Sequence, residues 1–231
     1  FRGPQNSRTV DSILREVDEL GAREIVLVAQ DLASFGKDRN ERGAIVPLVE
    51  AVAAEVDRVR LLYLYPSDLS DELVEAVLAT GVPYFDLSLQ HVSRPHLRRM
   101  RRWGDGQRFL DRIDAIRAAS PDAAFRSNFI VGYPGETEES MFETLRRASE
   151  MKYKFPRAAS DVFPFRPIPG TEDFDKAVRL GYRAPRNLEE WGGCLEYKES
   201  FDDIQIPEDV IRTWKRYGVA STFYDLSLIH I

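Results

Sequence analysis

FRSNFIVGYPGET, residues 125–137, passes from a strand-like run into a turn rich in glycine and proline and ends on a threonine that favours helix capping. The first part, residues 125–131, is short and rich in apolar residues, as is typical of a buried strand. Met141, Phe142 and Leu145 then recur at helical spacing. The stretch therefore predicts one strand followed directly by one helix.

The same order of strand and helix recurs on both sides of this stretch. Such alternation implies a parallel sheet with helices outside it. We therefore predict an α/β fold, either an open doubly wound sheet or a partial (β/α) barrel. No glycine-rich phosphate loop follows the first strand, which disfavours a dinucleotide-binding fold. The predicted strands are residues 25–29, 59–64, 84–89, 125–131 and 162–165, and the predicted helices carry apolar sets that begin at Val10, Ile45, Leu73, Phe109, Met141, Phe174 and Val210.

The composition is that of a chain with a buried core. Hydrophobic residues make up 43% of the 231 residues and charged residues 30%, which argues against a disordered chain. No apolar run approaches the ~20 residues needed to cross a bilayer. Cys194 is the only cysteine, which rules out a disulfide scaffold or a site of clustered thiolates within these residues and favours a cytoplasmic location.

Charge is unevenly distributed along the chain. The formal net charge is −6, so a general electrostatic affinity for nucleic acid is not expected. Arg98, Arg99, Arg101 and Arg102 nevertheless form a local basic cluster. Two readings stay open for this cluster: a solvated helix face, or a patch that steers an anionic substrate or RNA.

Polar side chains gather where the predicted strands end. In either architecture, ligands bind at the carboxyl ends of the strands, so these positions predict a ligand site. Structural alternatives are a simple turn after the first strand, a satisfied imidazole under a loop after the third, and an ion pair on the fourth. The candidate residues are Gln30 and Asp31 after the first strand, Ser88, Gln90 and His91 at the third, and Arg126 and Asn128 on the fourth, followed by the loop Gly132 to Glu136.

Six stretches, in this order and spacing, resemble the radical S-adenosylmethionine (radical SAM) methylthiotransferases. Within that family they look most like the branch that modifies an aspartate of a small-subunit ribosomal protein. The resemblance spans residues 1–139. The stretches are FRGPQNSR (1–8), EIVLVAQDLASFGKD (24–38), RVRLLYLYPSDLSDEL (58–73), PYFDLSLQHVS (83–93), LRRMRRWGD (97–105) and RSNFIVGYPGETEE (126–139).

The resemblance implies a role for each residue that matches the family's motifs. A zwitterionic cofactor with a sugar and a flat base needs a cation, several amides and an apolar ledge. The implied cofactor-binding residues are Gln30 and Asp31 near the methionine amino group, Ser88, Gln90 and His91 beside the cofactor and substrate pocket, Arg126 and Asn128 at the carboxylate or ribose, Val131, Gly132 and Pro134 behind the adenine, and Glu136 fixing that loop.

The family's chemistry implies more than this set of residues. A 4Fe-4S cluster on a CxxxCxxC loop donates an electron to SAM, and the resulting 5′-deoxyadenosyl radical attacks the substrate. A flavodoxin or ferredoxin is the implied electron donor and a ribosomal protein the implied partner. In the family, FRG follows soon after the cysteine loop, whereas here Phe1 is the first residue. We therefore expect a fragment without the first β/α unit, without metal ligands or catalytic residues of its own, and inactive.

We expect a boundary at about residue 180, where the alternation of predicted strands and helices ends. Residues 1–180 are expected to form the truncated barrel core, and residues 181–231 an irregular and helical segment. Residues 156–180, which include SDVFPFRPIPGTEDFD (160–175), look more like cobalamin-type radical SAM proteins. Either the chain is a divergent member, or two related genes are joined near residues 138–142. Two alternative functions remain: a fragment of a cobalamin-binding radical SAM enzyme, or a non-catalytic ligand-binding barrel fragment.

Overall fold

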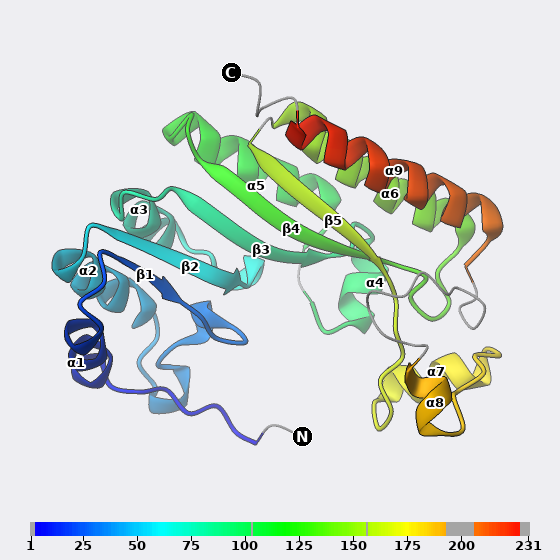
Figure 1. Ribbon diagram of the computed structural model, residues 1–231, viewed down its shortest axis with the longest axis horizontal. Helices are drawn as coiled ribbons and strands as arrows, with labels where there is room; N and C mark the ends of the chain where they lie inside the picture. The colour runs from blue at the N-terminus through cyan, green and yellow to red at the C-terminus, as the bar shows by residue number, and fades with distance from the viewer. Residues whose placement is uncertain (1–2, 103, 156, 193–205, 227–231) are drawn as a thin grey trace.

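Five parallel strands lie side by side in the order in which they occur along the chain (Figure 1). The computed structural model describes residues 3–102, 104–155, 157–192 and 206–226, the last eight of these as helix backbone only. Every pair of neighbouring strands is parallel. The strands are β1 (Glu24–Leu27), β2 (Arg58–Leu64), β3 (Tyr84–Gln90), β4 (Ala124–Val131) and β5 (Ala158–Pro164).

Helices connect the strands, and side-chain caps fix where several of them begin. Ser70 and Thr137 each accept a hydrogen bond from the backbone three residues later, as their sequence positions predict. Gly21 ends the first helix with a left-handed φ of 57°, a conformation that glycine adopts without strain. The helices are α1 (Val10–Leu20), α2 (Ile45–Glu55), α3 (Asp71–Ala79), α4 (Arg94–Arg99), α5 (Gly106–Ala119), α6 (Glu138–Lys154), α7 (Glu172–Arg179), α8 (Leu188–Gly192) and α9 (Glu208–Leu226), with 3₁₀ turns η1 (Leu32–Ser34), η2 (Lys37–Arg39) and η3 (Pro66–Asp68).

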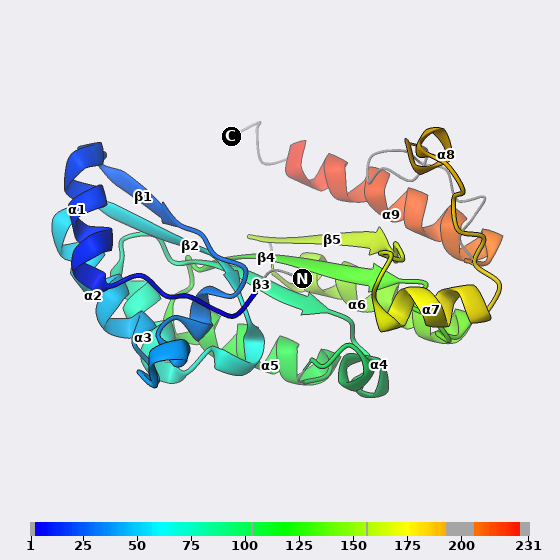
Figure 2. The same cartoon turned by 90° about the horizontal axis from the view of Figure 1, so that it is seen from below.

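The strand order decides between the two predicted architectures. A doubly wound sheet reverses its order at a switch point, whereas the strands of a (β/α) barrel follow each other around one direction. Here the order is β1-β2-β3-β4-β5 without a reversal. Figure 2 shows α2, α3, α5 and α6 together on one side of the sheet, with α1 beside the β1 edge. The predicted α/β fold is confirmed, and its topology is that of part of a (β/α) barrel.

The two faces of the sheet differ in character. Along β4, buried and half-buried residues alternate, and the buried set contains Phe125, Phe129 and Val131. Phe85 of β3 stacks on Phe125 with ring centroids 5.5 Å apart. These side chains face the helices and form the core. The opposite face, called the inner face below, carries the alternate residues of each strand and is largely polar.

Two elements differ from the sequence expectation or extend it. Strand β5 begins at Ala158, four residues before the predicted start, because its first buried positions are held by Ala158 and Ser160, which give little hydrophobic signal. The predicted last helix is confirmed as α9, and Trp214 Nε1 donates a hydrogen bond to the Val162 carbonyl oxygen at 2.6 Å. Ile206 and Val210 join the buried core.

The single cysteine, Cys194, lies outside the described residues. Within the described part of the chain, no helix is long and apolar enough to cross a membrane.

Candidate functional site

The inner face carries a row of charged groups centred on Arg126 of β4. The Arg126 guanidinium lies 3.5 Å from Asp86 Oδ2 on β3 and 3.7 Å from Asp161 Oδ2 on β5. Register explains the contacts, because Arg126 is aligned with Asp86 across the β3–β4 pair and Asp161 follows one alternation further on β5. The ion-pair reading of Arg126 is therefore confirmed, although 40% of its side chain remains exposed.

Burial changes the acid–base behaviour of this row. The Asp86 side chain is only 4% exposed, and loss of hydration raises the pKa of that carboxyl, while the nearby Arg126 opposes the rise. Burial likewise raises the pKa of Tyr84. Further along, Arg60 pairs with Glu24 at 2.9 Å and lies over the Tyr84 ring. The row thus runs across β1 to β5.

The sequence reasoning did not single out most members of this row. Asp86, Asp161 and Arg60 each lie inside a strand rather than at its carboxyl end, where ligand-binding residues are expected. The available signal was a charged residue within a buried parallel strand, since burying a charge is costly unless it is paired.

One amide on the inner face has an unmet hydrogen-bonding capacity. Asn128 Oδ1 is buried and has no hydrogen-bond partner among the described residues. Asp31 Oδ1, after β1, is in the same condition. Buried polar atoms without partners are uncommon in folded proteins, so each calls for an explanation. A ligand group with an N–H or O–H donor would satisfy either oxygen.

Two adjacent strands are irregular at their carboxyl ends. Tyr63 in β2 has φ 58° and Gln90 in β3 has φ 67°, both in the left-handed region that non-glycine residues rarely adopt. The pairing register shifts at the same places, between Leu61 and Leu64 and between Leu87 and Gln90. Such bulges re-aim side chains and are frequent beside ligand sites. Tyr63 is a further residue that the sequence reasoning did not single out.

The loop between β4 and α6, residues 132–136, is held by its own glutamate. The Glu136 side chain is fully buried. Its Oε2 accepts hydrogen bonds from the backbone N–H groups of Gly132 at 2.7 Å and Tyr133 at 3.1 Å. Its Oε1 accepts from His91 Nε2 at 2.8 Å and from Ser140 Oγ at 3.2 Å. These contacts are those of a residue that holds its own loop, which is the role that the resemblance implies for Glu136.

His91 belongs to the support of this loop. Its ring is fully buried, and its Nδ1 accepts a hydrogen bond from the Ser93 N–H at 2.9 Å. The ring proton is therefore on Nε2, which donates to Glu136. The ring stacks on His96 with centroids 4.7 Å apart. The structure thus shows a satisfied imidazole under a loop, which was the structural alternative for His91, and both ring nitrogens are already hydrogen-bonded within the protein.

The other predicted residues lie in two separate places. Ser88 and Gln90 are half-buried on the inner face. The Val131 side chain is 1% exposed and faces the helices, so it does not reach the inner face. Pro134 is also buried and lines a cavity of about 170 Å³ against the segment after β5.

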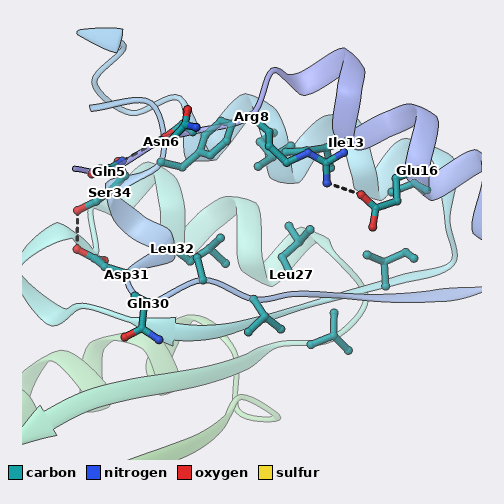
Figure 3. Close-up of a pocket in the computed structure, with 18 of the residues that line it drawn as sticks. Gln5, Asn6, Arg8, Ile13, Glu16, Leu27, Gln30, Asp31, Leu32 and Ser34 are labelled. Carbon is teal, nitrogen blue, oxygen red and sulfur yellow. Dashed lines mark hydrogen bonds and ion pairs between the residues drawn. The ribbon is translucent and has the colours of Figure 1, made fainter. Parts of the chain in front are cut away.

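A larger cavity of about 960 Å³ lies beside β1 (Figure 3). Gln30 and Asp31 line it together with residues of the N-terminal segment such as Gln5. Asp31 Oδ2 accepts a hydrogen bond from Ser34 Oγ at 2.5 Å, and Gln5 Nε2 donates to the Ser34 carbonyl oxygen at 2.6 Å. Its apolar wall includes Val26 and Val28, which are 45% and 59% exposed. The cavity is large enough for a nucleoside-sized ligand.

Within the described ranges, no group of three or more His, Cys, Asp or Glu side chains is arranged to hold a metal ion. The chain has one cysteine in all.

A comparison of the sequence with known protein families identifies the superfamily of this chain. The sequence profile of the Radical SAM superfamily matches residues 1–148. The chain belongs to the radical SAM superfamily. This match covers more than half of the 231 residues.

Curated radical SAM relatives make the likeness more specific. The ribosomal protein uS12 methylthiotransferase RimO of Salinispora arenicola is 44% identical over 179 residues, covering 74% of this chain and 34% of the relative. RimO of Acidothermus cellulolyticus is 48% identical over 152 residues, covering 62% and 32%. The predicted resemblance to this branch is confirmed. This chain spans about a third of the length of these relatives.

The match reaches beyond the stretch on which the resemblance was based. Residues 1–139 are about 60% of the chain, so a likeness that covers 74% continues past residues 138–142, where a junction was considered.

A solved structure of an N-terminally deleted Elp3 from Methanocaldococcus infernus is similar to this chain, with a TM-score of 0.44 and 12% identity, covering 92% of this chain and 58% of that chain.

Proposed function

We propose that this chain is the SAM-binding part of a radical SAM methylthiotransferase that acts on ribosomal protein uS12. The observation that carries the proposal is the 44–48% identity to RimO proteins over 60–74% of the chain. The proposed reaction adds a methylthio group to an aspartate of uS12. A cytoplasmic location and a flavodoxin or ferredoxin as electron donor belong to the same proposal.

The polar residues of the inner face fit SAM. The partly exposed Arg126 guanidinium suits a carboxylate, since arginine forms paired hydrogen bonds with that group. The unpartnered Asn128 Oδ1 suits a ribose hydroxyl or an ammonium. Gln30, Asp31, Ser88 and Gln90 are the further proposed contacts. SAM, when bound, supplies the reactive sulfonium, and the protein's part is to orient it and exclude water.

The iron–sulfur cluster that the family also implies does not fit this chain. Such clusters are held by several cysteine thiolates, and the sequence has Cys194 alone. No step of the reaction is therefore assigned to these residues. We propose that the 231-residue chain binds SAM without cleaving it.

A pair of adjacent substitutions tests SAM binding. Asn128→Ala removes an inner-face amide, whereas Ser127→Ala removes a hydroxyl on the helix-facing side of the same strand. Isothermal titration of the 231-residue chain with SAM should show binding that Asn128→Ala weakens about tenfold, the equivalent of one net hydrogen bond or slightly more. Ser127→Ala should leave the affinity unchanged. Absence of SAM binding by the unaltered, folded chain would refute the proposal.

The absence of turnover is tested separately. The chain is incubated with SAM and dithionite, and 5′-deoxyadenosine is measured by mass spectrometry. No product above a protein-free control is expected. Formation of 5′-deoxyadenosine would show that this chain does hold a cluster, contrary to the proposal.

A further inference from the structure

Four arginines form an exposed ridge beside the carboxyl ends of the strands. The arginine ridge consists of Arg98, Arg99, Arg101 and Arg102, at the end of α4 and just after it. In Figure 1, α4 lies at the end of the sheet toward which the strand arrows point. The first three of these side chains are exposed and Arg102 is half-buried. We propose that the arginine ridge is a docking surface for the phosphate backbone of RNA.

The negative charge beside the ridge comes from the first turn of α7, where Glu172 faces Arg101 and Asp173 accepts a hydrogen bond from Tyr133, the ring beneath Arg99. Arg101 pairs with Glu172 at 3.3 Å, but both side chains are more than 80% exposed, so the pair is weak and easily exchanged. No ion pair with a described acidic residue is found for Arg98, Arg99 or Arg102. In a chain of net charge −6, this concentration of unneutralised guanidinium groups stands out.

Aromatic rings hold two of these arginines in place. The Arg102 guanidinium lies over the Tyr65 ring, 4.6 Å from its centroid, and Tyr65 Oη donates a hydrogen bond to the Arg101 carbonyl oxygen at 3.3 Å. Arg99 lies over Tyr133, 5.8 Å from its centroid, and Lys176 approaches the same ring at 5.5 Å. The ridge is thus anchored to the end of β2 and to the loop of Glu136. Guanidinium groups held in this way lose less freedom on binding phosphate.

Arg101 occupies a position that glycine would fill more easily. Helix α4 ends with the Arg102 N–H bonded to the Leu97 carbonyl oxygen at 2.6 Å and the Arg101 N–H bonded to the Arg98 carbonyl oxygen at 3.0 Å. This pattern needs a left-handed residue, and Arg101 supplies it with φ 56°. A strained arginine on the surface, at a site where glycine relieves the strain, indicates that its charge serves binding rather than folding.

RNA suits these observations better than an acidic protein segment. Bidentate guanidinium groups match phosphate, and stacked arginine planes also receive unpaired bases. A six-residue helix is too short to read a DNA groove along its length. The choice of RNA over DNA also rests on the proposed function, since the proposed substrate is a ribosomal protein.

Fluorescence anisotropy with a labelled single-stranded RNA of about 15 nucleotides tests the proposal. A DNA strand of the same length and a glutamate peptide are the competing probes. Each phosphate contact on a single strand makes the logarithm of the binding constant fall by about 0.7 per tenfold rise in salt concentration. At 0.1 M salt, losing one such contact therefore weakens binding about fivefold. Arg98→Gln/Arg99→Gln should therefore weaken RNA binding about 25-fold and lower the slope by about 1.4. The control variant Arg15→Gln/Arg23→Gln removes the same charge from α1 and from the residue before β1, and it should change neither the RNA affinity nor the salt slope.

Arg101→Gly separates charge from folding. We expect RNA binding about fivefold weaker, by the same phosphate arithmetic, and a melting temperature equal to that of the unaltered chain or higher. A lower melting temperature with unchanged RNA affinity would mean that Arg101 is structural. The proposal is overturned if the unaltered chain does not bind RNA, if the double variant binds as the parent does, or if DNA or the glutamate peptide binds more tightly. SAM titration of the same samples reports the proposed function independently.

Discussion

The two ends of the inner face are built in opposite ways. At the β4 end, the loop 132–136 is tied down by a buried carboxylate that accepts bonds from two backbone groups, an imidazole and a hydroxyl. At the β1 end, a cavity of about 960 Å³ is walled by half-exposed valines, and the carboxyl of Asp31 keeps one oxygen without a described partner. The β4 end is therefore held by hydrogen bonds within the protein, whereas the β1 end keeps a cavity and a carboxylate oxygen that has no hydrogen-bond partner among the described residues.

This difference separates residues that shape the site from residues that would touch a ligand. A change at the closed end should alter the stability of the protein strongly. A change at the open end should leave stability almost unaltered and act on ligand binding. The predictions below test that separation, starting with the closed end.

Glu136→Gln should have the largest effect on folding. The substitution keeps the size of the side chain but replaces one buried acceptor oxygen by an N–H₂ group facing the donors of Gly132 and Tyr133 or of His91. Breaking a buried charged contact by altering one partner costs about 3–5 kcal/mol. Urea unfolding monitored by circular dichroism measures the change in free energy. Glu139→Gln, in the exposed first turn of α6, is the matched control and should stay within about 0.5 kcal/mol.

An equal loss in both variants would contradict the separation. It would mean that the loop of Glu136 gains no more from its buried carboxylate than the helix gains from an exposed one.

His96 should make the closed end sensitive to acid. Burial and the neighbouring His91 lower the pKa of His96 to about 4. Between pH 6.5 and 4, the unfolded chain binds a proton at this position that the folded chain does not, so stability falls as the pH drops through that window and the loss levels off below it. The expected total is about 3 kcal/mol, from about 2.5 pH units at 1.36 kcal/mol each.

His96→Phe removes the titrating group and keeps an aromatic ring between His91 and Tyr133. Urea unfolding at pH 7, 5.5 and 4.5 should show that the variant loses less stability on acidification than the unaltered chain. Parallel curves for the two proteins would place the acid sensitivity elsewhere in the molecule.

The closed end also shows what the sequence predicted and what it could not. The capping threonine, the turn and the strand were readable in FRSNFIVGYPGET because each depends on local preferences. That His91 lies beneath this loop was only one of two readings, since its partner Glu136 is 45 residues away. The ion pairs of Arg126 depend in the same way on the register of three strands.

Strand lengths were less readable where small residues replace large apolar ones. The start of β5 was placed too late, because Ala158 and Ser160 fill buried positions without a hydrophobic signal. The bulges at Tyr63 and Gln90 carried no sequence signal either, because neither residue is typical of the left-handed conformation that it adopts. Tertiary context imposes these features, so single-sequence reasoning finds the strands and misses their irregularities.

Val28→Ala should have the smallest effect. Val28 is 59% exposed in the wall of the open cavity, so truncating it removes little buried apolar surface and should cost under about 0.5 kcal/mol. Its neighbour Leu27 is 9% exposed and faces the core, and Leu27→Ala should cost about 2–5 kcal/mol in the same urea assay. If Val28→Ala proved as costly as Leu27→Ala, the wall of the cavity would be packed in solution. The open end would then be closed by groups of the protein itself, and the contrast with the β4 end would disappear.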